Sequence, residues 1–153
     1  MQLIKSFLGD EGEPPTSCEI LSSVDTNAGT GCNMTGVWVS DLGSVLKLAV
    51  LEDSELRGLL TSSVETVKGA AGSMRQGNVQ GILNRGPRPS FAFSVAWDGG
   101  STSSWVGQCF VQEDGRRVLK TLWMLRSFAL SSVDNWKSTR MGEDTFYSVP
   151  PDE

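Results

Sequence analysis

Five tryptophans are the residues of this chain best suited to holding a ligand. They are Trp38, Trp97, Trp105, Trp123 and Trp136, in a sequence with no histidine and a single tyrosine. An indole offers a large rigid apolar face and one N–H donor, so several of them in one small domain indicate a packed core or a lined pocket. Without histidine, Ser-His-Asp triads, Cys-His dyads and His-ligated metal sites are excluded. The composition therefore favours binding over catalysis.

Charge and cysteine usage exclude further classes of function. The formal net charge of −5 argues against a protein that follows nucleic-acid phosphates, which would carry a basic patch. No apolar run is long enough to span a bilayer, and the apolar stretch before Asp10 is too short for a clear signal peptide. Cys18, Cys32 and Cys109 lack the close spacing of a zinc site or a redox motif. We expect no nucleic acid, membrane, metal or cofactor among the partners.

The tryptophans have to be positioned by strands, because the organised part of the chain alternates with period two. The clearest case is residues 90–98, where Phe91, Phe93, Val95 and Trp97 share one face. Turn sequences such as Asp114-Gly115 separate the segments. We predict eight strands, at about 35–41, 44–51, 55–64, 77–83, 90–98, 103–112, 116–127 and 137–147.

An even number of sequential antiparallel strands can close on itself, which removes exposed edges and leaves room for one small ligand. The predicted fold is therefore all-β, an eight-stranded antiparallel up-and-down barrel over residues 32–147. Residues 1–31 are rich in Gly, Pro, Ser, Thr and acids and are predicted to be a flexible extension. Residues 148–153 are predicted to be a flexible tail, and residues 65–74 a loop without a strong helix.

Several motifs together resemble the avidin and streptavidin family of biotin-binding proteins. They are Thr35-Gly36-Val37-Trp38, Asp41-Leu42-Gly43-Ser44, Gly107-Gln108-Cys109-Phe110, Lys120-Thr121-Leu122-Trp123-Met124-Leu125-Arg126 and Asn135-Trp136-Lys137-Ser138-Thr139-Arg140, in matching order and spacing. The resemblance implies this closed barrel, assembly as a homotetramer, and non-catalytic binding of biotin in a preformed pocket without a cofactor.

The resemblance also implies roles for individual residues. Trp97, Trp105 and Trp123 would form an aromatic box around the ring system of biotin, and Trp136 would cap a neighbouring subunit's pocket. The remaining implied roles are the apolar wall (Leu42, Leu125), the ureido oxygen (Ser40, Ser44), the ureido nitrogens (Ser62, Asp144), the carboxylate tail or ring sulfur (Ser101, Ser103), and further lining (Leu60, Val64, Thr66, Val67). Within each strand the implied interior residues share a face, as Trp38, Ser40 and Leu42 do. Trp38 itself is expected to pack near the closed end.

The family's intrachain disulfide implies a bridge between Cys32 and Cys109, hence an oxidising compartment and a secreted protein. Cys18 has no counterpart in the family. Asn33-Met34-Thr35 is a sequon, so a secreted chain would be a glycoprotein modified at Asn33.

Two positions depart from the family pattern. Leu60 stands where the family has a tyrosine whose hydroxyl binds the ureido oxygen, and Ser40 stands where a longer asparagine is usual. An unmet buried acceptor costs about 1 to 3 kcal/mol, so we predict weaker biotin binding than in the tightest members. Two alternatives stay open: a tetrameric structural module whose pocket has decayed, and a carrier of another small apolar ligand.

Overall fold

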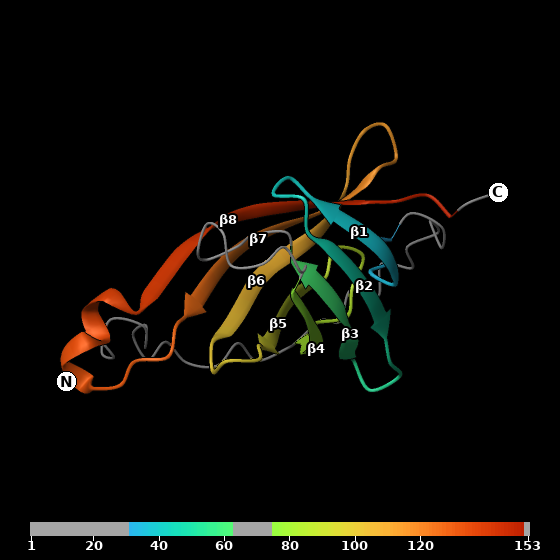
Figure 1. The fold of residues 1–153 in the computed structure, drawn as a ribbon. Helices are drawn as coiled ribbons and strands as arrows, with labels where there is room; N and C mark the ends of the chain where they lie inside the picture. The colour runs from blue at the N-terminus through green and yellow to red at the C-terminus, as the bar shows by residue number, and fades with distance from the viewer. Residues whose placement is uncertain (1–30, 63–74, 152–153) are drawn as a thin grey trace, which may run out of the picture.

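The computed structural model describes residues 31–62 and 75–151, and their eight strands form one closed barrel (Figure 1). Each strand pairs antiparallel with the next along the chain, and the last pairs with the first. The strands are β1 (Gly36–Ser40), β2 (Val45–Val50), β3 (Glu55–Ser62), β4 (Arg75–Leu83), β5 (Ser90–Ala96), β6 (Thr102–Val111), β7 (Arg117–Arg126) and β8 (Thr139–Ser148). The predicted fold class is confirmed.

The connection between β7 and β8 contains a 3-10 helix that the strand pattern did not predict. This helix, η1, spans Ser132–Lys137, and the side chain of Ser131 caps it by accepting from the N–H of Val133. Asp134 in its first turn and Lys137 in its last turn complement the helix dipole. As a consequence β8 begins at Thr139, two residues later than the predicted start at Lys137.

Some expectations concern residues outside the described part of the chain. These are most of the extension over 1–31, the loop over 65–74, and the last two residues of the tail. Within residues 31–62 and 75–151, no helix has the length and apolar character that a membrane crossing requires.

One end of the barrel, which we call the floor, is closed by packed side chains. Trp38 is fully buried there, its Nε1 donates to the backbone carbonyl of Met34 at 2.9 Å, and the guanidinium of Arg117 lies 5.3 Å from its ring centroid. The disulfide between Cys32 and Cys109 is present, as expected, and both cysteines are buried in the same core cluster. Trp38 thus has the packing role that the sequence predicted.

The opposite end, which we call the mouth, carries the β1–β2 turn, the β5–β6 turn and the β7–β8 connection. This follows from the up-and-down order, in which successive connections alternate between the two ends. In Figure 1, η1 and the β6–β7 hairpin accordingly lie at opposite ends of β7. Close to the floor, β1 and β8 remain paired to their outer ends, where the N–H of Val149 donates to the carbonyl of Val37 at 2.8 Å.

Candidate functional site

A row of aromatic side chains crosses the inner face of the barrel from β5 to β7. Cross-strand pairing places Phe93 beside Trp105, Trp105 beside Trp123, and Trp123 beside Gly142. The rings of Phe93 and Trp105 stack, with centroids 5.0 Å apart and an interplanar angle of 19°. Both are buried. The row forms a continuous apolar wall on one side of the interior.

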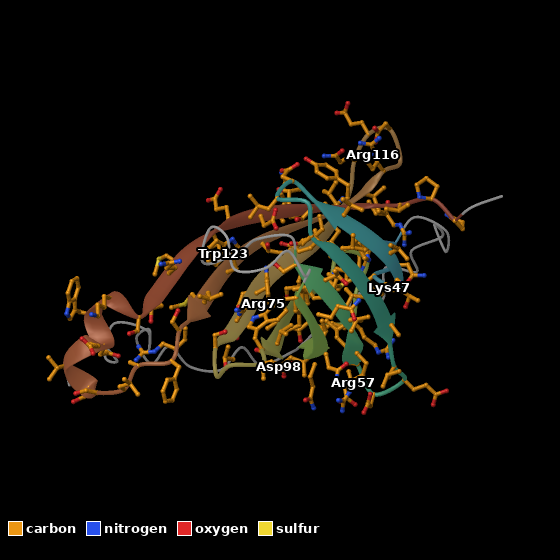
Figure 2. All side chains as sticks on the ribbon, in the orientation of Figure 1. Lys47, Arg57, Arg75, Asp98, Arg116 and Trp123 are labelled. Atoms are coloured by element: carbon orange, nitrogen blue, oxygen red, sulfur yellow. A yellow bond between two sulfur atoms is a disulfide. The ribbon has the colours of Figure 1, made fainter. Side chains whose placement is uncertain are left out.

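Trp123 can lie against β8 because its cross-strand neighbour has no side chain. A Cβ added at Gly142 would come within 2.7 Å of the Trp123 indole. Figure 2 shows Trp123 on β7, in the part of the barrel where β7 runs beside β8. Its Nε1 is buried and has no hydrogen-bond partner among the described residues. Gly142 therefore sets the depth at which this ring sits.

Trp97 lies at the mouth end of β5, directly after Ala96, and its polar atom is satisfied inside the barrel. Its Nε1 donates to Ser103 Oγ at 2.8 Å, and both side chains are buried. Gly77 on β4 makes room for Val95 and for this ring, since a Cβ there would come within 2.2 Å of Val95 Cγ1 and within 3.2 Å of the indole. The hydrogen bond fixes the orientation of the indole and occupies one lone pair of Ser103.

Asp144 is a buried carboxyl on β8 near the β1–β2 turn. It accepts from the N–H of Thr145 at 2.9 Å, and it also hydrogen-bonds with the Ser40 side chain and the backbone of Leu42. Burial raises the pKa of Asp144; these hydrogen bonds oppose the rise, and the negative charge of Asp41 adds to it. Thr121 lies beside it in the β7–β8 pairing and donates to its backbone carbonyl at 2.8 Å.

The β1–β2 hairpin brings Ser40 and Ser44 together. The backbone N–H of Ser40 donates to the carbonyl of Ser44 at 2.9 Å, and the N–H of Ser44 donates to Ser40 Oγ at 3.1 Å. Both serines are buried. Because Val45 pairs with Thr61, the next position along each strand places Ser44 near Ser62 at the end of β3. The structure thus gathers four polar residues of the predicted site around one part of the interior: Ser40, Ser44, Ser62 and Asp144.

Leu60 lies one inward position deeper than Ser62 and is fully buried. It pairs with Leu46 on β2 and with Gly77 on β4. Its side chain presents only methyl groups to the interior. The side chain at this position therefore contributes no polar atom to the barrel interior.

Leu42 does not lie where the sequence predicted. The alternation of β1 ends at Ser40, and Leu42 lies in the following turn with 48% of its surface exposed. The prediction that Leu42 continues the inward face of Trp38 and Ser40 was wrong, because turn residues do not keep the strand period. Its backbone rather than its side chain reaches the interior cluster, through the contact with Asp144.

The other predicted site residues divide into three groups. Ser101 and Leu125 are partly buried near the mouth, as is Ser62. Trp136 is on η1 and is 81% exposed, so it does not contribute to the interior of its own barrel. Val64, Thr66 and Val67 lie outside the described residues.

The sequence reasoning did not assign site roles to three residues that shape this interior. Thr121 and Phe93 follow the same strand alternation as the predicted residues, so the period-two pattern was the available signal. Gly142 gives no such signal, because its importance comes from the ring that covers it in the neighbouring strand.

Comparison with known proteins gives consistent results. The family model described as the Avidin family matches residues 28–149. Avidin from Gallus gallus is 36% identical over 117 residues, covering 75% of this chain and 77% of avidin. Avidin-related protein 1 from the same organism is 37% identical over 118 residues, with the same coverage of each chain.

Solved structures agree with the sequence relatives. Xenavidin superimposes with a TM-score of 0.72 at 35% identity, covering 78% of this chain and 99% of xenavidin. A biotin binding protein from chicken gives a TM-score of 0.71 at 30% identity, covering 78% of this chain and 98% of that protein.

Proposed function

Because this chain belongs to the avidin family, whose members are non-enzymatic biotin binders that need no cofactor, we propose that it binds biotin inside its barrel. The observation that carries the proposal is the pairing of an aromatic wall with a buried polar cluster in one interior. Trp105 and Trp123 belong to the wall, Trp97 adds a third indole at the mouth end of β5, and Asp144 lies at the centre of the cluster.

The two parts of the interior suit the two parts of biotin. Aromatic faces exclude water from an apolar ring system, which is the main source of affinity. The ureido group loses its water partners on burial and needs hydrogen bonds in return. A carboxylate can only accept, so Asp144 is assigned to a ureido N–H, with Ser62 facing the other nitrogen. Ser44 is assigned to the ureido oxygen, together with Ser40.

The remaining residues of the site are assigned by the family pattern. Ser101 and Ser103 are assigned to the tail or the ring sulfur, and Leu42 and Leu125 to the apolar wall. Val64, Thr66 and Val67 are assigned to further lining of the pocket. Trp136 is proposed to cap the pocket of a neighbouring subunit, which the exposure of its ring supports.

We propose a homotetramer with one site per subunit, as is typical of the family. A secreted protein, glycosylated at Asn33, is proposed from the disulfide and the sequon. Asn33 is exposed, and its Oδ1 accepts from the N–H of Thr35 at 3.0 Å, so the asparagine of the sequon lies at the surface.

Isothermal titration of the purified protein with biotin tests the proposal. Saturable binding at one biotin per subunit, abolished or strongly weakened by Trp123→Ala and Trp105→Ala, is the expected result. A folded tetramer that releases no heat with biotin would favour the structural module instead. Preference for a different apolar ligand in a competition panel would favour the carrier.

The effect of Leu60 gives a sharper test of affinity. Leu60→Tyr supplies a hydroxyl at the polar end of the pocket, and we expect it to bind biotin about tenfold more tightly, the equivalent of one hydrogen bond of about 1.4 kcal/mol. Leu60→Phe is the matched control, because it adds the same ring without the hydroxyl. Equal affinities for the two variants would mean that the missing hydroxyl does not limit binding.

A further inference from the structure

Two hairpin loops of the barrel contain the same reactive dipeptide, an aspartate followed by a glycine. Asp98-Gly99 is in the β5–β6 connection at the mouth, and Asp114-Gly115 is in the β6–β7 connection at the floor. Figure 2 shows Asp98 and Arg116, which belong to these two connections, at opposite ends of the barrel. The chain therefore presents one dipeptide in two different surroundings.

At the floor, hydrogen bonds hold both reactive groups of the dipeptide. The N–H of Gly115 donates to the carbonyl of Gln112 at 2.9 Å. Asp114 Oδ1 accepts from the N–H of Arg116 at 2.9 Å, which is the contact of an Asx turn. The amide nitrogen of Gly115 and the carboxyl group of Asp114 are thus each held away from the other.

The mouth loop closes in the same way, but its dipeptide comes one position earlier in the loop. The N–H of Trp97 donates to the carbonyl of Ser101 at 2.8 Å, as the N–H of Gln112 does to the corresponding carbonyl at the floor. The N–H that completes the turn at the mouth belongs to Gly100, which donates to the carbonyl of Trp97 at 3.3 Å. The N–H of Gly99 consequently has no hydrogen-bond partner in the part of the chain that the structure describes.

The carboxyl group of Asp98 is not held either. The residue is exposed, and within residues 31–62 and 75–151 its side chain forms no hydrogen bond and no ion pair. Gly99 has a φ of +93°, a conformation that favours glycine, and a Cβ at this position would meet nothing within 4 Å. An unhindered backbone nitrogen therefore lies next to an unengaged carboxyl group, which favours reaction between them.

We propose that Asp98 is a site of spontaneous isomerisation to isoaspartate. The nitrogen of Gly99 attacks Cγ of the carboxyl group in its protonated form, and the N–H proton and the hydroxyl group leave as water. The product is a cyclic succinimide, and water then adds to one of its two carbonyl carbons. Addition at Cγ breaks the new bond and restores aspartate. Addition at the backbone carbonyl carbon breaks the original peptide bond, so that the chain runs through Cβ and Cγ and the carboxylate remains on Cα. The water released in the first step is regained in the second, and no oxidant or reductant is needed.

Isomerisation lengthens the backbone of the mouth loop by one atom. The added atom lies between Trp97 and Ser101, whose hydrogen bond closes the loop. Trp97 is also bonded through Nε1 to Ser103 Oγ at 2.8 Å, so a change in the loop is transmitted to a buried indole. Resting on the proposed biotin-binding function, this consequence predicts that the isomerised protein releases biotin faster.

Peptide mapping tests the modification without any ligand. The full chain is incubated for several weeks at neutral pH and body temperature and digested with a protease that cleaves before aspartate but not before isoaspartate. Incubation in ¹⁸O-labelled water identifies products that passed through the succinimide, since these gain a heavy oxygen. We expect isoaspartate to form at Asp98 at least about fivefold faster than at Asp114. Equal rates at the two positions, or no isoaspartate at Asp98, would overturn the proposal.

A double variant tests whether the position of the dipeptide in the loop is the cause. Asp98→Glu with Gly99→Asp gives the mouth loop the same residue order as Glu113-Asp114-Gly115 at the floor. Isomerisation at the mouth should then slow to the rate of Asp114, because the nitrogen after the aspartate is now the one that completes the turn. Thermal melting establishes that the variant folds. An undiminished rate in the folded variant would contradict the structural explanation.

The rate of biotin dissociation tests the consequence for binding. Incubated natural protein should release biotin in two phases, and the fast fraction should equal the isoaspartate fraction found by peptide mapping. Asp98→Ser is the matched control, because it has no carboxyl group to form the ring and should release biotin in one phase. A single phase from protein that contains isoaspartate at position 98 would overturn the effect on the mouth. Fresh protein that binds no biotin would overturn the proposed function, whereas the peptide map would still decide the isomerisation.

Discussion

Asp144 is the only charged residue that is buried among the described residues, and its position has consequences for stability as well as for binding. Burial raises its pKa despite the hydrogen bonds from Thr145 and Ser40. The folded state therefore holds the proton more tightly than the unfolded state, where the pKa is about 3.9. Stability from this residue is fully present below that value and is lost as the pH rises through the raised pKa.

Asp144→Asn should therefore stabilise the ligand-free protein at pH 7, because the amide resembles the protonated carboxyl. Melting temperatures of the two proteins measured from pH 3 to pH 8 should converge at the acid end and separate as the pH rises. At pH 7 the same variant should bind biotin more weakly, by about 1.5 to 3 kcal/mol for a lost charge-assisted hydrogen bond. A variant that is less stable at every pH would contradict this account.

Gly142 controls the position of the Trp123 ring. Gly142→Ala places a Cβ where the indole now lies, and we expect a loss of about 1 to 3 kcal/mol in the free energy of unfolding from overpacking. Displacement of the ring into the pocket should also weaken biotin at least tenfold, which titration would measure. Glu143→Ala, on the exposed face of the same strand, is the control. Unchanged biotin affinity in Gly142→Ala would show that the Trp123 ring can move without entering the pocket.

At the scale of elements, strands were predictable and connections were not. The alternation around Phe91, Phe93 and Val95 predicted β5 to within two residues, because a half-buried strand repeats its chemistry every second residue. The position of Leu42 and the helix η1 were not predicted, because connections have no such repeat. A turn and a short 3-10 helix depend on local capping by Ser131 and on hydrogen bonds to neighbouring strands, which leave no periodic signal.

In the candidate site, too, some features could be predicted from the sequence and others could not. The inward direction of Trp105, Trp123 and Asp144 follows from strand parity, so the sequence was sufficient to predict it. The engagement of Ser40 with Asp144 depends on the register between β1 and β8, two strands that are neighbours in the barrel but are the first and the last along the chain. Strand parity indicates on which face of the sheet a side chain lies, whereas the register between neighbouring strands decides which residues are in contact.

The disulfide ties the segment before β1 to β6. Cys32 and Cys109 are separated by 77 residues, and in the chain-entropy model a loop of that length contributes about 4 kcal/mol. Changing both cysteines to alanine should lower the free energy of unfolding by about that amount, as measured by chemical denaturation. Because the bridge is at the floor, biotin affinity in the folded variant should remain within a few fold of the natural chain. A large loss of affinity with little loss of stability would contradict this separation.

At the scale of the whole molecule, the outer face of the barrel carries apolar residues that a monomer would leave in water. Val106, Leu122 and Met141 are between 61% and 72% exposed, and Met124 is half exposed on the same strands. Contiguous exposed apolar groups typically mark an interface, and the proposed tetramer would cover them.

Leu122→Lys tests that interface. Burial of an unpaired charge should reduce the tetramer to smaller species, which light scattering coupled to size-exclusion chromatography would measure. If Trp136 completes a neighbour's site, the smaller species should also bind biotin more weakly, to the extent seen for Trp136→Ala in the tetramer. A tetramer that persists in Leu122→Lys would place the interface on another face.

The pairing of β1 with β8 has a practical consequence. Both strands reach the floor at their outer ends, since Gly36 begins one and Ser148 ends the other, and Val149 remains bonded to Val37. The two points where the polypeptide enters and leaves the barrel are thus neighbours on the side facing away from the ligand. A reporter or an immobilising tag could be attached through either point, and cargo linked to biotin would still approach without obstruction.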